Sequence, residues 1–111
     1  MKIVQKPWGH EEIWAQTDKY VGKYLVINPG KRLSRQYHLK KEETIRVLSG
    51  ELHLETGDEK TLTILVPGDI FHVSPGVIHR FGADSLQTVL VEVSTPELDD
   101  VVRLEDDFSR V

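Results

Sequence analysis

The stretch that decides the fold is Pro29–Gly50, PGKRLSRQYHLKKEETIRVLSG, in which two runs of strand-forming residues flank a polar break that can turn the chain. Gln36 and His38 are two residues apart, so in a strand their side chains point to the same face. Glu43 follows the polar break and opens the second run. One amide oxygen, one imidazole and one carboxylate can therefore converge on a point inside a curved sheet.

A metal site of this kind needs a fourth ligand, and His79 in the segment SPGVIHR is the best candidate. Imidazole combined with oxygen donors suits a divalent metal, with zinc as the first expectation and Mn, Fe, Co or Ni as alternatives. The competing interpretation makes His38 and His79 ordinary core or surface histidines. The spacing and the turn glycines favour the ligand interpretation, whereas His53 and His72 are expected to be structural or surface residues.

Short segments rich in β-branched and aromatic residues recur along the chain and are separated by turn signals. This pattern predicts an all-β barrel or double-sheet sandwich, formed by a single domain over residues 1–111. The acidic tail from residue 94 is expected to form a short helix or an extended arm. The expected strands begin at EEIWA (11–15) and continue at 20–27, 33–38, 44–48, 51–55, 61–66, 70–73, 77–81 and 86–93.

The composition excludes several classes of protein. Charged residues make up 29% of the chain and the net charge is -4, so no affinity for nucleic acid is expected. No run of about 18 apolar residues is present, and the N-terminus lacks the apolar stretch of a secretory signal, so neither a membrane span nor export is expected. The absence of cysteine excludes disulfides and thiolate metal sites, and it fits a cytoplasmic protein.

The spacing of these residues resembles the two motifs of the cupin family, small β-barrels with a metal in the lumen. The first motif is matched by Gly30, Gln36, His38, Glu43 and Gly50, with Gln in place of the usual first His. The second is matched by Gly68, Gly76 and His79, while Ser74 and Ala83 replace the usual Pro and Asn. The resemblance implies a double-stranded β-helix, or jelly-roll barrel, and a homodimer formed by strand exchange or sheet packing. It also implies a metal held by Gln36, His38, Glu43 and His79.

A narrower resemblance covers residues 6 to 110. It is a similarity to the metal-dependent mannose-6-phosphate isomerase domain of cupin type. The similarity is carried by the N-terminal segment KPWGHEEIW, the segment LSRQYH and the tail DDVVRLEDDFSR. In larger bifunctional members of that family the domain follows a sugar-nucleotide pyrophosphorylase domain, which is not expected within residues 1–111. Thr44 stands where the family usually has His, and Leu39, Lys40 and Lys41 stand where it usually has several His residues. These departures leave the metal ligands in place and put the identity of the sugar in doubt.

The resemblance implies conversion of mannose-6-phosphate to fructose-6-phosphate through an enediol. Such a reaction needs a cation beside the developing enediolate and a base over the C1–C2 edge. The residues expected to take part in catalysis are Lys23, Glu43 and Arg103. The base stays open between Lys23, a hydroxide on the metal, and Asp99 or Asp100, and Glu43 can be a ligand or a base.

A phosphate group would need Arg or Lys at the barrel mouth. Lys23, Arg32, Arg80 and Arg103 are the candidates, and the competing interpretation pairs Arg80 and Arg103 with the acidic tail. For Lys23 the alternative is a packed stem whose amine reaches water. The alternatives to this isomerase are an isomerase or epimerase of another sugar, a non-catalytic cupin that binds metal and carbohydrate, and an Fe(II) or Mn(II) oxygenase. Gln36 in place of His disfavours the oxygenase.

Overall fold

The structure is a computed structural model that describes residues 1–111; it consists of eleven β-strands and contains no helix. None of its elements is therefore a helix that could cross a membrane. The strands are β1 (Lys2–Lys6), β2 (Gly9–Gln16), β3 (Val21–Ile27), β4 (Arg35–Tyr37), β5 (Glu43–Ser49), β6 (Leu52–Thr56), β7 (Thr61–Leu65), β8 (Ile70–Val73), β9 (His79–Gly82), β10 (Thr88–Ser94) and β11 (Val102–Glu105).

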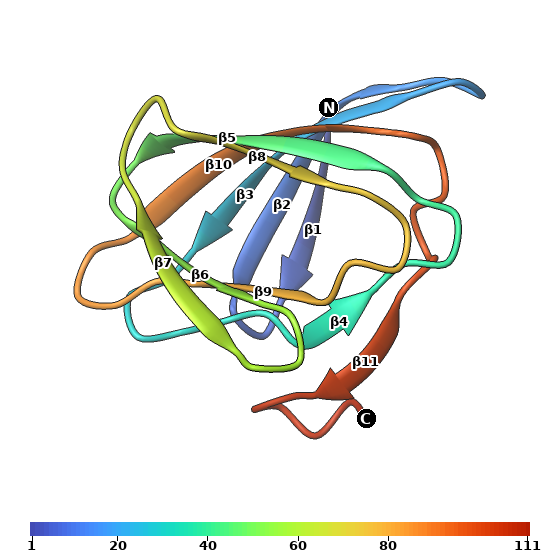
Figure 1. Ribbon diagram of the computed structural model, residues 1–111. Coiled ribbons are helices and arrows are strands. Elements are labelled where there is room, and N and C mark those ends of the chain that lie inside the picture. The colour runs from blue at the N-terminus through green and yellow to red at the C-terminus, as the bar shows by residue number, and fades with distance from the viewer.

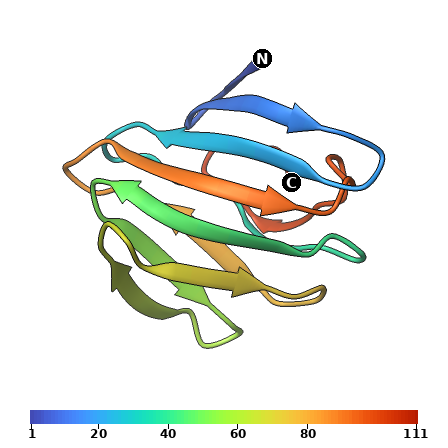
Figure 2. The ribbon, with the colours of Figure 1, turned by 90° about the horizontal axis from the view of Figure 1, so that it is seen from above.

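The strands form two antiparallel sheets that face each other and curve into a barrel (Figure 1). One sheet has six strands in the order β1-β2-β3-β10-β5-β8, and the other has five in the order β11-β4-β9-β6-β7. Seen from above, the six strands lie side by side in front of the second sheet (Figure 2). The predicted all-β architecture of two sheets is confirmed.

In β5 and β10, buried and outward-pointing residues alternate and supply part of the core between the sheets. In β5, Glu43, Ile45 and Val47 are buried, whereas Thr44 and Arg46 point outward. The same alternation puts Leu90 of β10 into a cluster of twelve buried apolar residues. Burying one such Leu side chain stabilises the fold by about 1.5–3 kcal/mol relative to leaving it in water.

Two glycines of the predicted motifs occupy backbone conformations that other residues rarely adopt. Gly30 has a φ of 75° in the turn after Pro29, as predicted. Gly50 has a φ of 79°, and a Cβ at this position would lie 2.4 Å from the carbonyl oxygen of Gln87. A side chain at Gly50 would therefore push β5 away from the start of β10.

Three elements differ from the predictions. The polar N-terminal segment forms β1 as an edge strand on β2, which the sequence pattern did not indicate. The tail contains β11, which pairs with β4, so the helix alternative is wrong and the extended one is confirmed. The predicted strand 33–38 is regular only over Arg35–Tyr37, because Arg32 and Leu33 instead bond to residues of the β9 end.

Candidate functional site

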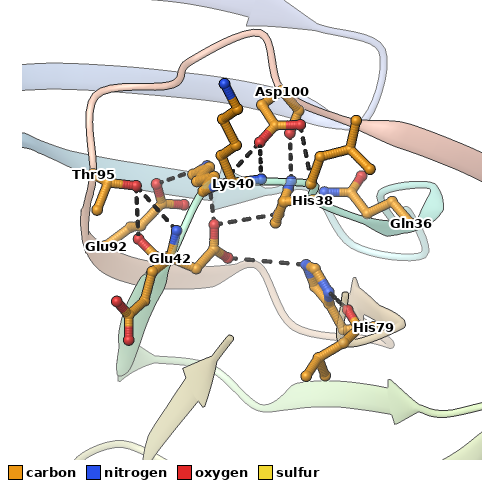
Figure 3. A network of polar contacts seen from close by, with 12 residues as sticks. Gln36, His38, Lys40, Glu42, His79, Glu92, Thr95 and Asp100 are labelled. Carbon is orange, nitrogen blue, oxygen red and sulfur yellow. Dashed lines mark hydrogen bonds and ion pairs between the residues drawn. The ribbon is translucent and has the colours of Figure 1, made fainter. Parts of the chain in front are cut away.

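His38, Glu43 and His79 converge in the space between the two sheets (Figure 3). His38 follows β4 directly, Glu43 is the first residue of β5, and His79 is the first residue of β9. One ligand atom from each lies within 4.8 Å of the others, and all three residues are at most 3% exposed. Nε2 of His38 is 3.5 Å, and Nε2 of His79 is 3.9 Å, from the Glu43 carboxylate.

Both imidazoles are oriented by backbone carbonyl groups. Nδ1 of His38 lies 2.6 Å from the Asp100 carbonyl oxygen, and Nδ1 of His79 lies 2.9 Å from the Val77 carbonyl oxygen. Because a carbonyl oxygen only accepts, each ring donates from Nδ1 and keeps a lone pair on Nε2. Both Nε2 atoms are buried and have no hydrogen-bond partner. Two lone pairs and one carboxylate around one point fit the donor set of a divalent metal.

The protonation of these three residues is shifted by burial. Burial lowers the pKa of His79 to about 4 and also lowers the pKa of His38, so both rings are neutral at pH 7. Burial, together with the nearby Glu92 carboxylate, raises the pKa of Glu43 to about 7 against the opposing charge of Lys41. A bound cation would favour the ionised form of Glu43, so metal and proton compete for this site.

Gln36, the fourth predicted ligand, lies beside His38 (Figure 3), and the two residues line one hollow of the barrel. It is the register partner of His79 across β4 and β9, so the two side chains share a face. Its amide oxygen accepts a hydrogen bond of 2.6 Å from the Ser34 hydroxyl. The structure thus brings three of the four predicted ligands together, and the role of Gln36 as a ligand stays a prediction.

A buried chain of alternating charges extends from Glu43 into the six-stranded sheet. Lys41 Nζ lies 2.9 Å from Glu43 and 3.2 Å from Glu92. Lys23 Nζ lies 3.9 Å from Glu92 and 3.0 Å from Glu11. Charges this deep are tolerated because each has a partner of opposite sign, and removing one partner would leave an uncompensated buried charge.

Sequence reasoning missed Lys41 and Glu92. Glu92 carries a signal that could have found it, because it is the only charged residue at an inward position of the apolar strand β10. Lys41 lies in a polar loop where nothing marks it as buried. For Lys23 the interpretation in which the amine reaches water is wrong, since its side chain is only 5% exposed. Its catalytic role stays a prediction.

Asp100 anchors the loop between the candidate ligands His38 and Glu43. Its carboxylate accepts hydrogen bonds from the backbone N–H groups of Leu39, Lys40 and Lys41, at 2.7–3.0 Å, while its carbonyl orients His38. These N–H groups lower the pKa of Asp100 to about 2. Because these bonds stabilise its ionised form, Asp100 is poorly suited to the role of base for which it was considered.

The hollow in front of His38 is small and strongly cationic. It has a volume of about 70 Å³, and the cationic residues that line it outnumber the acidic ones, Glu11 and Asp100. The cationic residues are Lys6, Lys23, Lys41, Arg103 and Arg110.

Arg103 is the arginine of this hollow that lacks an ion-pair partner. It is paired in register with Gln36 across β11 and β4, and its Nε is buried without a hydrogen-bond partner. Arg110 is instead bound to Asp106. The interpretation that paired Arg103 with the acidic tail is therefore wrong, and its catalytic role stays a prediction.

The other two predicted phosphate ligands lie elsewhere. Arg80 donates to the Leu33 carbonyl and pairs with Asp107 at 3.0 Å, so its pairing with the tail is confirmed. The expected surface location is wrong, because Arg80 is only 3% exposed. Arg32 also binds Asp107, through two hydrogen bonds. Both line a separate hollow beside Asp84 rather than the one that contains His38. His53 lines that separate hollow too, and His72 is half-exposed, as expected for residues outside the site.

The metal-free protein is expected to show opposing pH effects on stability. The folded pKa of His79, about 4, lies below the ordinary value of 6.5. The stability that neutral His79 contributes to the folded state is therefore complete above pH 6.5 and is lost as the pH falls toward 4. The folded pKa of Glu43, about 7, lies above 4.5, so its contribution is complete below pH 4.5 and is lost as the pH rises toward 7. Between pH 4.5 and 6.5 the two contributions oppose each other.

Glu43→Gln removes the titration of Glu43, so the pH dependence of stability that His79 causes should become visible. In the presence of chelator, its free energy of unfolding should fall on the order of 3 kcal/mol from pH 6.5 to pH 4, because 2.5 pKa units on His79 correspond to that amount. The wild-type chain should fall less over the same range. Urea unfolding at a series of pH values measures both curves, and parallel curves would contradict the opposition of the two groups.

Comparisons with known proteins agree with this geometry. The family model described as mannose-6-phosphate isomerase C-terminal matches residues 1–106. The chain is 31% identical over 111 residues to the xanthan biosynthesis protein XanB of Xanthomonas campestris pv. campestris (strain B100), covering 96% of this chain and 23% of XanB. It is 28% identical to a mannose-1-phosphate guanylyltransferase of Sinorhizobium fredii, covering 92% of this chain and 20% of the relative. The chain thus spans only about a fifth to a quarter of these relatives.

The fold is shared with solved structures. A protein with a double-stranded β-helix domain from Klebsiella pneumoniae superposes with a TM-score of 0.75 at 24% identity, covering 86% of this chain and 84% of that one. This likeness concerns the fold alone, and it confirms the predicted double-stranded β-helix.

Proposed function

This chain belongs to the mannose-6-phosphate isomerase C-terminal family, and from that premise we propose that it is a metal-dependent cupin isomerase of a sugar phosphate, with mannose-6-phosphate as the first candidate. One observation carries the proposal: two unpartnered imidazole nitrogens and a carboxylate meet beside a hollow whose cationic residues outnumber its acidic ones. A metal site with two neutral imidazoles and one carboxylate, next to positive side chains, suits an anionic sugar whose oxygens gain charge during reaction.

In this proposal each residue of the site has a separate role. His38, Glu43 and His79, with Gln36 as the fourth donor, would hold a divalent metal, zinc first and Mn, Fe, Co or Ni as alternatives. When bound, the metal supplies a Lewis acid beside the oxygens of the enediolate.

Arg103, whose Nε has no partner in the chain, would hold the phosphate. Glu43 and Lys23 are the candidates for moving the proton between C1 and C2. A phosphorylated sugar substrate and the absence of cysteine fit a cytoplasmic enzyme.

The test is turnover of mannose-6-phosphate in deuterated water, followed by NMR on a sample whose metal content has been measured. Fructose-6-phosphate should appear with deuterium at the carbon that receives the proton, and chelator should stop the reaction. A metal-loaded chain that converts no hexose or pentose phosphate would overturn the isomerase proposal.

One observation favours a second candidate, a non-catalytic cupin that binds metal and carbohydrate. The Lys41 ammonium lies 2.9 Å from the Glu43 carboxylate and lowers its affinity for a proton, which opposes a role of Glu43 in moving the proton. Such a module would raise its melting temperature with a sugar phosphate but give no product. The NMR sample therefore separates the two candidates when its melting temperature is measured with and without sugar phosphate.

A further inference from the structure

A further hollow, here called the outer hollow, lies on the outward face of the six-stranded sheet. It has a volume of about 500 Å³, within the range of sites that bind small molecules. Its floor is one cross-strand row, in which Gly22 of β3 pairs with Val93 of β10 and Val93 pairs with Thr44 of β5. Thr44 pairs in turn with His72 of β8. The β2–β3 hairpin forms one wall, at the side of the sheet where the bordering ends of β5, β8 and β10 also lie (Figure 2).

Two local features place the Trp14 ring over the floor of the outer hollow. Trp14 is the extra residue of a β-bulge between Ile13 and Ala15, where the register with β3 shifts. Gly22 leaves room for the ring, because a Cβ at this position would lie 2.7 Å from two Trp14 ring atoms. Bulges redirect side chains next to functional sites, and a glycine inside a strand allows close approach of another group. The local sequence is therefore arranged to hold an aromatic ring at this place.

The Trp14 ring has one side against the sheet and is otherwise largely uncovered. Trp14 is 47% exposed, although tryptophan is highly buried on average. The Tyr24 ring packs beside it, with 6.1 Å between the ring centroids, and Tyr20 in the hairpin is 54% exposed. Together with Val93 these rings give one end of the outer hollow an apolar surface, on which the C–H face of a sugar ring can pack.

The opposite end of the outer hollow is polar. His72 Nδ1 lies 3.1 Å from the Thr44 hydroxyl, and His72 Nε2 lies 2.9 Å from the Glu42 carboxylate. These contacts hold the three side chains together and use only part of their capacity, since an ionised carboxylate offers about four acceptor sites. The side chains of His72 and Glu42 are about half exposed, so the remaining sites are open to the hydroxyl groups of a ligand.

The charge of the outer hollow disfavours a phosphorylated ligand. Its lining contains one cation, Lys19, and two acidic residues, Glu42 and Glu43, so an anionic group would not be attracted. The hollow in front of His38 has the opposite balance, with more cationic than acidic residues. The two hollows therefore suit ligands of different charge.

The length of the outer hollow suits more than one sugar ring. Gly22, beneath the Trp14 ring, and Thr44 are separated by two strand spacings, about 10 Å. A single sugar ring stacked on Trp14 would not reach the polar end, whereas the second of two linked rings would.

We infer that the outer hollow binds an uncharged oligosaccharide of at least two rings, one stacked on Trp14 and the next hydrogen-bonded by Glu42 and Thr44. Thr44 follows Glu43 in β5 and its side chain points to the opposite face, so this site and the metal centre lie on different sides of one strand. The inference does not rest on the proposed function.

Tryptophan fluorescence of the full chain tests the inference, because Trp8 is only 2% exposed and Trp14 is the accessible tryptophan. The probes are mannobiose, cellobiose and maltose. At least one should change the emission with a Kd on the order of 1 mM. Methyl mannoside should bind at least about fivefold more weakly, because one ring makes only part of the contacts. Inorganic phosphate should cause no change.

Two variants address the two ends of the outer hollow. Trp14→Leu keeps an apolar cover on Gly22 but removes the aromatic ring, and Glu42→Gln removes the carboxylate. Titration followed by protein NMR should show that each weakens binding of the best probe about tenfold. Ile70→Ala, exposed on the same sheet face but outside the outer hollow, should stay within about twofold of wild type. Circular dichroism first establishes that each variant is folded, and bound metal should be unchanged in all three.

Three results would overturn the inference. The first is that none of the three disaccharides binds at concentrations up to about 20 mM. The second is binding that both Trp14→Leu and Glu42→Gln leave unchanged. The third is an emission that changes with protein concentration but not with sugar, because a second copy of the chain would then cover the Trp14 ring.

Discussion

His79→Ala should reduce the bound divalent metal to less than about a tenth of one equivalent after dialysis, and isomerase activity should fall at least about 1,000-fold. The ring contributes one of two unpartnered Nε2 atoms, and alanine offers no donor. The remaining donors would be His38, Glu43 and the neutral amide of Gln36, which are too few strong donors to retain the ion. Elemental analysis by mass spectrometry gives the metal content. His38→Ala should have the same effect, because it removes the other imidazole.

The matched control is His72→Ala. His72 lies on β8, is half-exposed, and bonds to Thr44 and Glu42 on the outside of the sheet. Its variant should keep full metal content. The His79 ring also packs against the Phe81 ring, with 5.3 Å between the ring centroids. Thermal unfolding must therefore establish that His79→Ala is folded before its metal content is measured. Full occupancy in both His38→Ala and His79→Ala would refute the metal centre.

Arg103→Gln should raise the KM for mannose-6-phosphate roughly 10- to 100-fold, since a hydrogen bond to a charged group contributes about 1.5–3 kcal/mol. Arg103 enters the hollow with Nε unpaired, whereas Arg110 is already committed to Asp106. The loss should be confined to phosphorylated ligands, so weak binding of unphosphorylated mannose should change little. Steady-state kinetics and calorimetric titration measure the two effects.

Arg32→Gln is the control for this second experiment, because it removes the same charge from a different hollow. Its KM should stay within about twofold of wild type. Equal effects of the two substitutions would mean that net charge, rather than a contact with phosphate, governs affinity. An unchanged KM in Arg103→Gln would remove Arg103 from the proposed substrate contacts.

Much of the fold could be predicted because local patterns and turn chemistry agree. The alternation in β5 and the turn glycines Gly30 and Gly50 mark strand and turn on their own. β1 escaped prediction because Lys2–Lys6 is a polar edge strand whose pairing with β2, rather than its composition, makes it a strand. The tail became β11 through pairing with β4, which no local signal encodes.

The candidate site was predictable where spacing alone places residues, as for His38, Glu43 and His79. The rest depends on contacts between distant segments. Lys41 can be both charged and buried because Glu43 and Glu92 approach it from β5 and β10. Arg80 and Arg103 are both expected as possible partners of the acidic tail, yet Arg80 bonds to the tail and Arg103 faces the hollow. That difference depends on which face of its sheet each strand position occupies, and this follows only from the register.

The bond between His38 and Asp100 joins residues 62 positions apart, and it has a consequence for the order of folding. Contacts this distant form late, because closing the intervening loop costs conformational entropy before the contact can stabilise the fold. Until the segment with Asp100 has docked, the loop 39–41 lacks its anchor and the His38 ring lacks its orientation. In a partly folded chain the metal-ligand side chains are therefore not yet held together as a site. Tight binding of a metal ion would then indicate that the segment with Asp100 has docked.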